Sequence, residues 1–424
     1  MGAVRWPRAR RKLPGGPVRS YAAATPRARL IREPDFWRLW LVGLVVYAVR
    51  WLEMLAVAVF VYQRTGSPFI VAALTMLRML PMALFGAVIG AVAERLERRT
   101  ALIIVVSSMG LTSLTLGLLA FAGTLAVWHL AVASFVNGIG WTTDNPVRRT
   151  MIGEAVGSER MSSAMSIDVG ANNASQILGP TVGGVLLASF GMGGVFSCSV
   201  LCYLVALAAA LRVRHRYHTG HSGAQSVLAR IIEGLVLVRR DRRLIAVLTI
   251  TVVYNMFGWP ASSMVPVIGN GSLHLGAAGV GVLTSMGGVG AFCGAVAIAL
   301  LVRQPLFSRV YLGGVFAYLI MVPVFALVPY AAAAGSVLLM TGVANACFSI
   351  MQATLVYLAA PPEMRSRIYG VLSVCIGIGM LGFILIGVLA NLIGAPWATA
   401  ATGGEGLLAL ALTRRWWRPL TAPA

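Results

Sequence analysis

Charged residues are scarce in this chain. Asp, Glu, Lys and Arg together make up 11% of its 424 residues, whereas hydrophobic residues make up 58%. Soluble domains carry about 25% charged residues, because a hydrated surface needs them. The composition therefore excludes a soluble protein of this length. The long apolar runs instead predict an all-α protein that crosses the lipid bilayer many times.

Motifs of enzyme chemistry are missing as well. The sequence has no Gly-rich loop ending in Lys-Ser or Lys-Thr, no His-Glu-x-x-His and no Cys-x-x-Cys. ATP-driven and zinc-dependent reactions are not expected without them. We therefore expect no enzymatic activity, no metal and no cofactor. The five cysteines lie within apolar runs and are interpreted as packing residues: Cys198, Cys202, Cys293, Cys347 and Cys375.

Acidic residues are the rarer charges, with 13 against 34 basic residues and a net charge of +21. Such a balance is also found in nucleic-acid-binding proteins, but here the arginines occupy short gaps between apolar runs, so no nucleic acid is expected. Of the 34 basic residues, 31 fall in tails and loops on one side of the expected membrane. The positive-inside rule therefore predicts a cell (inner) membrane protein with both termini cytoplasmic.

Twelve apolar segments of about 20 residues are predicted to span the bilayer. They form two halves, 39–212 and 244–413, separated by a basic connection, 213–243, which includes an amphipathic stretch. A basic tail, 1–38, is predicted to be disordered, and a cytoplasmic tail occupies 414–424. The predicted spans are 39–62, 69–92, 101–122, 126–146, 164–190, 193–212, 244–268, 277–302, 309–329, 335–358, 368–393 and 396–413.

The two halves show weak sequence similarity to each other. The loop after the fourth span contains Glu159-Arg160, and the loop after the tenth contains Glu363-Met-Arg365, about half the chain length later. An internal repeat of this kind is typical of transporters whose binding site lies at the membrane midplane between the halves.

The loop between the second and third spans carries the most specific motif. It reads Gly90-Ala-Val-Ala-Glu94-Arg95-Leu-Glu97-Arg98-Arg99. This resembles the signature of the major facilitator superfamily, G-x-L-A-D-R-x-G-R-R/K, at the place expected for it. The motif differs from the signature at Glu94 and Glu97. The form with Glu97 resembles that of exporters related to the enterobactin exporter, within the drug–proton antiporter branch.

The resemblance implies a charge clasp that closes the cytoplasmic side. We expect Arg98 to pair with Asp144 at the end of the fourth span. Glu94 is expected at the positive N-terminus of a neighbouring helix, which the resemblance identifies as the eleventh span. The alternative is an ordinary charged loop.

The fifth predicted span carries a second motif, which resembles the antiporter motif of facilitator-type exporters. Glycines four residues apart allow another helix to approach closely, and a proline bends the helix. Generic packing of small residues is the alternative interpretation. The motif residues are Gly170, Gly179, Pro180, Gly183 and Gly184.

Arg50 and Glu53 lie near the centre of the first predicted span. Residues three apart share a helix face, so both charges and the Tyr47 hydroxyl are expected to point the same way. A charge at this depth normally faces a partner or a wet cavity. We interpret the pair as a site of substrate binding or proton coupling; the alternative is a self-neutralising pair that fixes helix packing.

Other polar residues within the spans are weaker candidates, because each could equally be a hydrogen-bonding contact between helices. Asp168 is expected to cap its helix or to pair with Arg148 or Arg149. The fourth span has Ser134 where many family antiporters carry an arginine. The remaining candidates for substrate binding or proton coupling are Arg78, Asn137, Asn173, Gln176, Asn255, Asn345 and Glu405.

The sequence therefore predicts two six-helix bundles in a major facilitator fold. The expected function is proton-coupled export of a small, partly hydrophobic compound, such as a drug, siderophore or metabolite, by a monomer that works through alternating access. An uptake symporter is the first alternative. A membrane scaffold or sensor that transports nothing is the second.

Overall fold

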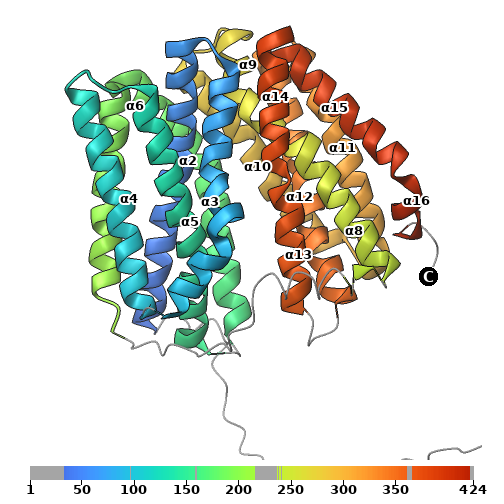
Figure 1. The fold of residues 1–424 in the computed structure, drawn as a ribbon, viewed down its shortest axis with the longest axis horizontal. Helices are drawn as coiled ribbons and strands as arrows, with labels where there is room; N and C mark the ends of the chain where they lie inside the picture. The colour runs from blue at the N-terminus through green and yellow to red at the C-terminus, as the bar shows by residue number, and fades with distance from the viewer. Residues whose placement is uncertain are drawn as a thin grey trace, which may run out of the picture.

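The computed structural model describes residues 33–95, 97–157, 160–214, 236, 238–239, 241–360 and 365–420. Throughout these ranges the regular structure is helical, with no strand. Figure 1 shows two groups of helices standing side by side, one from blue to green and the other from yellow to red. The first helix begins and the last helix ends at the same end of the molecule, as an even number of crossings requires.

The first group contains five helical segments. In the longest of them, α6, the chain reverses at Gly191, whose φ of 63° is accessible to glycine at little cost. This segment therefore accounts for both the fifth and the sixth predicted spans. The segments are α2 (Pro34–Thr65), α3 (Pro68–Arg95), α4 (Arg98–Phe121), α5 (Val127–Val156) and α6 (Met161–Leu211).

The second group is less regular. The seventh predicted span, 244–268, is not one helix, because a π-helical turn and the Trp259-Pro260 sequence interrupt it; proline supplies no N–H to continue the ladder. The segments are α8 (Arg242–Val253), η1 (Tyr254–Gly258), η2 (Trp259–Ser263), α9 (Met264–Gly271), α10 (Ala277–Leu301), η3 (Gln304–Leu306), α11 (Phe307–Leu327), α12 (Ala331–Ala359), α13 (Arg365–Gly377), α14 (Gly379–Ile393), α15 (Ala395–Leu412), α16 (Arg414–Trp417) and η5 (Arg418–Leu420).

Eight helical stretches of the described chain are long and apolar enough to cross a membrane, and one of them, Ser163–Leu211, holds two predicted spans. Helix α5 is not among them because polar residues, including Asn137 and Asp144, lower its hydropathy. Most of the basic connection, with its amphipathic stretch, lies outside the described residues. Within 414–424, residues 414–420 are helical, and the Trp417 indole donates to the Leu410 carbonyl at 2.8 Å.

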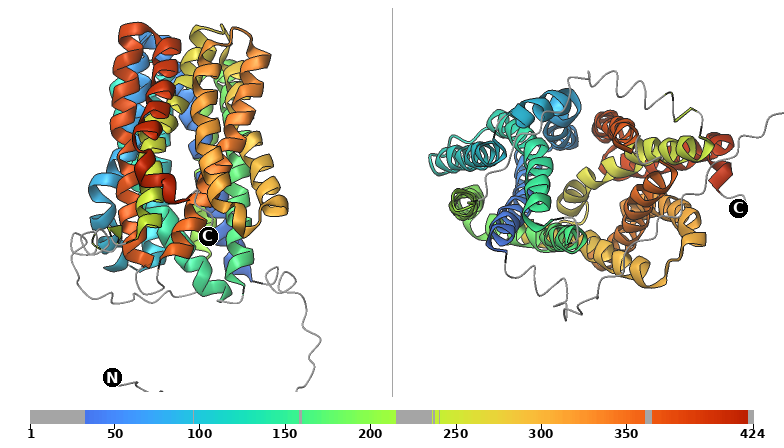
Figure 2. Two further views of the ribbon diagram at one scale, coloured as in Figure 1. Left: turned by 90° about the vertical axis from the view of Figure 1, so that its right-hand side faces the viewer. Right: turned by 90° about the horizontal axis from the view of Figure 1, so that it is seen from below.

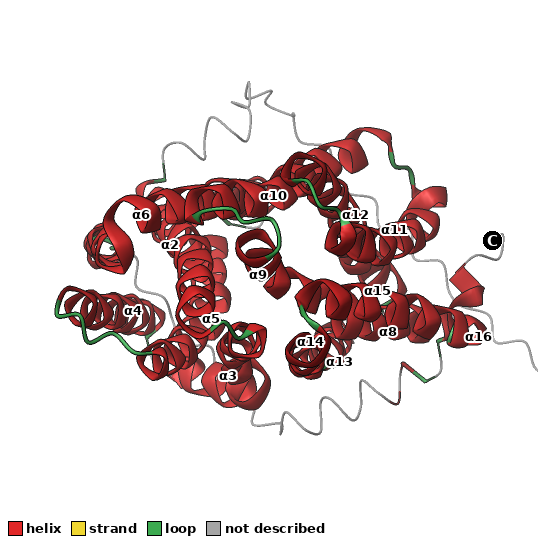
Figure 3. Cartoon of the chain, turned by 90° about the horizontal axis from the view of Figure 1, so that it is seen from above, coloured by secondary structure: helices red, strands yellow, loops and turns green. Residues whose placement is uncertain are grey.

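The two groups meet through small residues towards the end of the molecule opposite the chain ends. A Cβ atom on Gly184 of α6 would lie 2.4 Å from the carbonyl oxygen of Ala277, and one on Gly288 of α10 would lie 3.0 Å from the Gln176 backbone. Across the other seam, the hydroxyl of Ser67, just before α3, donates to Asn391 of α14 at 3.2 Å. Seen from above, α9 lies between the two groups (Figure 3). The end of the molecule where α2 begins is called the basic end. The end where these small residues meet is called the opposite end.

Candidate functional site

A cavity of about 390 Å³ lies between the two helix groups. One wall comes from α2, α3 and α6, and the other from the broken seventh span, α10, α11, α12 and α14. The view from below shows the two groups on either side of the centre of the molecule (Figure 2). Three of the predicted polar residues line the cavity: Arg50, Gln176 and Asn345.

Arg50 is the one cation among the described residues of the cavity wall. Its guanidinium carbon lies 3.7 Å from the ring centroid of Trp141 and 5.4 Å from that of Trp51, so two indoles flank the charge. Arg50 Nε and both indole N–H groups are buried and have no acceptor among the described residues. The guanidinium and the two indoles beside it therefore hold three donors that no described residue accepts from.

Glu53 does not pair with Arg50, contrary to the expected arrangement. Its carboxylate is buried, accepts from Ser113 at 2.7 Å and from Asn137 at 3.5 Å, and is attracted by Arg78 of α3. Residues three apart on a helix are offset by about 60°, and this offset sends Arg50 to the cavity and Glu53 into the first helix group. The electrostatic attraction on Glu53 comes from Arg78 of α3 rather than from Arg50.

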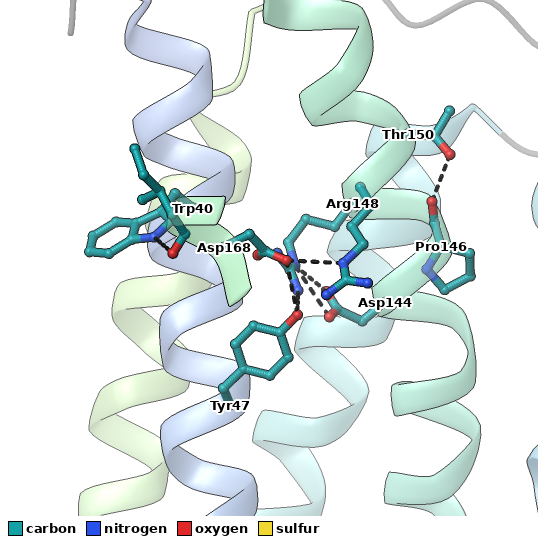
Figure 4. Close-up of polar contacts among 9 residues, drawn as sticks. Trp40, Tyr47, Asp144, Pro146, Arg148, Thr150 and Asp168 are labelled. Atoms are coloured by element: carbon teal, nitrogen blue, oxygen red, sulfur yellow. Dashed lines mark hydrogen bonds and ion pairs between the residues drawn. The ribbon is translucent and has the colours of Figure 1, made fainter. Parts of the chain in front are cut away.

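Tyr47 also differs from expectation, because its hydroxyl contacts a second buried cluster rather than Glu53 (Figure 4). Arg148 Nη2 donates to this hydroxyl at 2.8 Å, and the hydroxyl donates to Asp168 at 3.2 Å. Arg148 also contacts Asp144 at 3.2 Å and pairs with Asp168. The prediction for Asp168 is confirmed, since Arg149 contacts it as well, at 3.0 Å. We call Tyr47, Asp144, Arg148, Arg149 and Asp168 the Arg148 cluster.

A glycine makes room for the Arg148 cluster. A Cβ atom on Gly43 of α2 would lie 2.2 Å from Arg148 Nη1, so any other residue would collide with the guanidinium. The side chains of Arg148, Asp144 and Asp168 are all fully buried. The charges of two carboxylates and two guanidiniums therefore cancel where α2, α5 and α6 meet.

The expected clasp between Arg98 and Asp144 is not formed. Asp144 already pairs with Arg148, and Arg98 instead contacts Glu154 near the end of α5. Both partners of the Arg98–Glu154 pair are partly exposed, so its contribution is about 0.2–1 kcal/mol. Gly90 lies within α3, whereas the side chains of Glu94 and Arg95 in the same motif are outside the described part of the structure.

The glycines of the motif in the fifth predicted span, which lies on α6, differ in what surrounds them. A Cβ atom on Gly183 would lie 2.5 Å from the Leu52 carbonyl oxygen of α2, and one on Gly179 would lie 2.6 Å from Trp51 Cβ. Gly184 and Pro180 face α10 of the other helix group. Gly170 has open space around it. The motif is thus a packing surface for two helices at once, and Gly170 is not part of it.

Alanine at Gly183 is expected to lower the free energy of unfolding by about 1–3 kcal/mol, because its Cβ would press on backbone that cannot move aside. Alanine at Gly170 is the matched control, since a Cβ fits there and glycine is a poor helix former. Thermal unfolding of the purified variants in detergent measures both. Equal unfolding temperatures for the two variants would contradict the packing role.

The remaining candidates are dispersed. Asn255 donates to the Thr251 carbonyl at 2.8 Å, which is a packing contact within the seventh span. Asn173 and Glu405 do not line the cavity, although Glu405 Oε2 is buried without a donor among the described residues. Aromatic residues of the cavity wall were missed, because an aromatic residue within an apolar span gives no signal that separates cavity from lipid: Tyr254, Trp259, Tyr318 and Phe383.

Two helical groups around a central cavity, joined by glycine-rich contacts, define a membrane transporter of the major facilitator type. The chain belongs to the transmembrane secretion effector family of this type, whose sequence profile matches residues 25–420. The family consists of transporters, not enzymes.

Curated relatives are similar over part of their length. Macrolide efflux protein A of Streptococcus pyogenes is 22% identical over 235 residues, which cover 55% of this chain and 58% of that protein. Its counterpart in Enterococcus faecalis is 23% identical over 200 residues, 47% of this chain and 62% of the relative. YfiS of Bacillus subtilis, an uncharacterised transporter of the same type, is 31% identical over 147 residues, 34% of each chain.

Solved structures share the fold. A variant of the nucleoside transporter NupG superposes with a TM-score of 0.75 at 12% identity, covering 90% of this chain and all of that one. A bacterial homologue of the human lysosomal transporter Spinster, in an inward-facing and unoccupied conformation, gives 0.71 at 14% identity, over 95% of this chain and all of the other.

Proposed function

We propose that this protein is a secondary exporter that carries small, partly hydrophobic compounds out of the cell by alternating access, using proton exchange. The central cavity is the observation that carries the proposal, because alternating access requires a site between two helix groups that can open to either side. The efflux activity in the names of the streptococcal and enterococcal relatives supports export over uptake. The basic end, in this proposal, faces the cytoplasm.

The wall of the cavity indicates the chemistry of its substrate. Aromatic side chains from both helix groups line the wall, among them Trp51 and Tyr254. Binding pockets of a few hundred Å³ with apolar walls and few polar groups are typical of small-molecule sites. Arg50 and Trp51, both in the cavity wall, carry N–H donors that have no acceptor among the described residues. A compound with an apolar body and an acceptor or anionic oxygen would satisfy both features.

Glu53 is the proposed proton carrier. Its neighbours Arg50, Trp51 and Met54 line the cavity, so the carboxylate lies directly behind the cavity wall. The protonation state of a buried carboxylate responds to the charges and hydration around it, and movement of the helix groups would change both. A substrate bound to Arg50 would be linked to Glu53 through α2.

Glutamine at Arg50 is expected to reduce export about 10- to 100-fold, which corresponds to the loss of a charged hydrogen bond of about 1.5–3 kcal/mol. Glutamine at Arg64, an exposed arginine in the last turn of the same helix, is the matched control and should change export less than twofold. The measurement is intracellular accumulation of a panel of toxic compounds and metabolites in cells expressing each variant. Equal export by both variants would remove Arg50 from the site, whereas inward accumulation would favour a symporter.

A further inference from the structure

A second cavity, of about 850 Å³, lies at the basic end of the first helix group, away from the central cavity. Residues from three places in the chain line it: the start of α2, the start of α4 and the segment that follows α6. The lining residues are Arg38, Glu97, Arg99, Leu211, Arg212, Val213 and Arg214. We call this the arginine pocket.

Positive charge is in excess in the arginine pocket. Four arginines line it, against one glutamate, and Glu97 already accepts from the Thr100 hydroxyl at 3.1 Å. Asp35 offsets part of the charge, because it pairs with Arg38 at 2.7 Å and accepts from the Arg214 backbone N–H at 3.3 Å. The pocket therefore keeps a positive field after its own ion pairs are formed.

One donor of the pocket, on Arg99, lacks an acceptor within the described part of the chain. Arg99 is fixed by a hydrogen bond from Nη2 to the Leu211 carbonyl at 2.7 Å, yet its Nε is buried with no acceptor among the described residues. Helix α4 begins beside it, 24 residues long, and Glu97 at its N-cap forms no side-chain cap. A fixed guanidinium and the N-terminus of a long helix both favour an anion at this position.

Tryptophans and exposed leucines adjoin the pocket. Trp37 and Trp40 lie on the first turns of α2, next to Arg38, and tryptophan is enriched at the membrane–water interface. Leu211, in the pocket wall, ends a row of exposed leucines along α6 that includes Leu201 and Leu204. An acyl chain lying on this row would bring its headgroup to the arginines.

We propose that the arginine pocket binds the phosphate headgroup of an anionic phospholipid. The phosphate would lie among Arg99, Arg212 and Arg214, at the N-terminus of α4, and the acyl chains would extend along α6. Basic pockets between transmembrane helices at the cytoplasmic surface are suited to such headgroups. Because the pocket joins α2, α4 and the exit of α6, the lipid would hold the loop motif at Glu97 and Arg99 against the first helix group.

The test is lipid binding to the purified full-length protein, measured by native mass spectrometry with added phosphatidylglycerol or phosphatidylcholine. We expect the wild type to prefer phosphatidylglycerol. The variant with both Arg212→Gln and Arg214→Gln should bind it about 10- to 30-fold more weakly, since each arginine near the surface contributes roughly fivefold. The matched control carries Arg242→Gln and Arg243→Gln, two exposed arginines at the same end of the molecule but outside the pocket, and should bind as the wild type does.

Three outcomes would overturn the proposal. Equal binding of the two lipids would show that the pocket does not select an anion. An equal loss of binding in the control variant would show that total charge, not the pocket, attracts the lipid. Displacement of phosphatidylglycerol by the same concentration of glycerol phosphate would identify the ligand as a soluble phosphate rather than a lipid.

Discussion

Alanine at Arg148 is expected to lower the free energy of unfolding by about 3–5 kcal/mol, the largest stability effect of any single change considered for this protein. The substitution leaves Asp144 fully buried without its ion-pair partner and removes one of the two guanidiniums that neutralise Asp168. It also removes the donor to the Tyr47 hydroxyl. Buried charges stranded in this way cost far more than the original pairs contribute. Thermal unfolding in detergent and the yield of folded protein measure the effect.

Arg149 supplies the control, because it touches the same Asp168 but its side chain is 38% exposed. Alanine at Arg149 removes a pair that water already screens, and the expected loss is below about 1 kcal/mol. If the two variants unfold at the same temperature, the Arg148 cluster does not hold α2, α5 and α6 together.

Glutamine at Glu53 is expected to abolish accumulation against a gradient while downhill movement of substrate continues. Glutamine keeps the shape of the side chain and can still bond to Ser113 and Asn137, but it cannot take up or release a proton. The helix groups can still alternate, so the substrate would equilibrate across the membrane without being concentrated. The measurement compares uphill and downhill transport of one substrate in proteoliposomes.

Glutamine at Glu154 is the matched control for the coupling experiment, because it removes a carboxylate from a partly exposed pair with Arg98. Its uphill transport should remain within a fewfold of the wild type. An unchanged response to the proton gradient in the Glu53→Gln variant would assign Glu53 a structural role beside Arg78. Glu405, whose carboxylate has a buried oxygen without a donor among the described residues, would then be the next residue to test.

The helices could be predicted from the sequence because their signal is local. Each predicted span falls on helical segments of the described chain, and glycines with positive φ mark reversals, as Gly66 does after α2 and Gly191 within α6. The pairing of Asp168 with Arg148 and Arg149 was also predictable, since buried charges require partners and few were available.

The choice among possible partners could not be predicted. Arg148 lies one turn from Asp144 on the same helix and pairs with its carboxylate. Arg98 contacts Glu154 instead. Glu53 accepts hydrogen bonds from Ser113 and Asn137 on other helices rather than pairing along its own helix with Arg50. Both outcomes depend on helix rotation and packing, which periodicity does not determine. The broken seventh span was missed for a related reason, because an uninterrupted apolar run conceals the π-helical turn before Pro260.

Substrate movement by the purified wild-type protein in proteoliposomes, with and without an imposed pH gradient, tests the central claim most directly. The substrate would be a compound that expressing cells extrude. With the pH gradient imposed, protons should flow towards the basic end, and an exporter driven by proton exchange should concentrate the compound on the side that the opposite end faces. When the gradient is dissipated, the compound should only equilibrate. Absence of any movement under both conditions would contradict the account and identify the protein as a membrane scaffold or sensor with a transporter's fold.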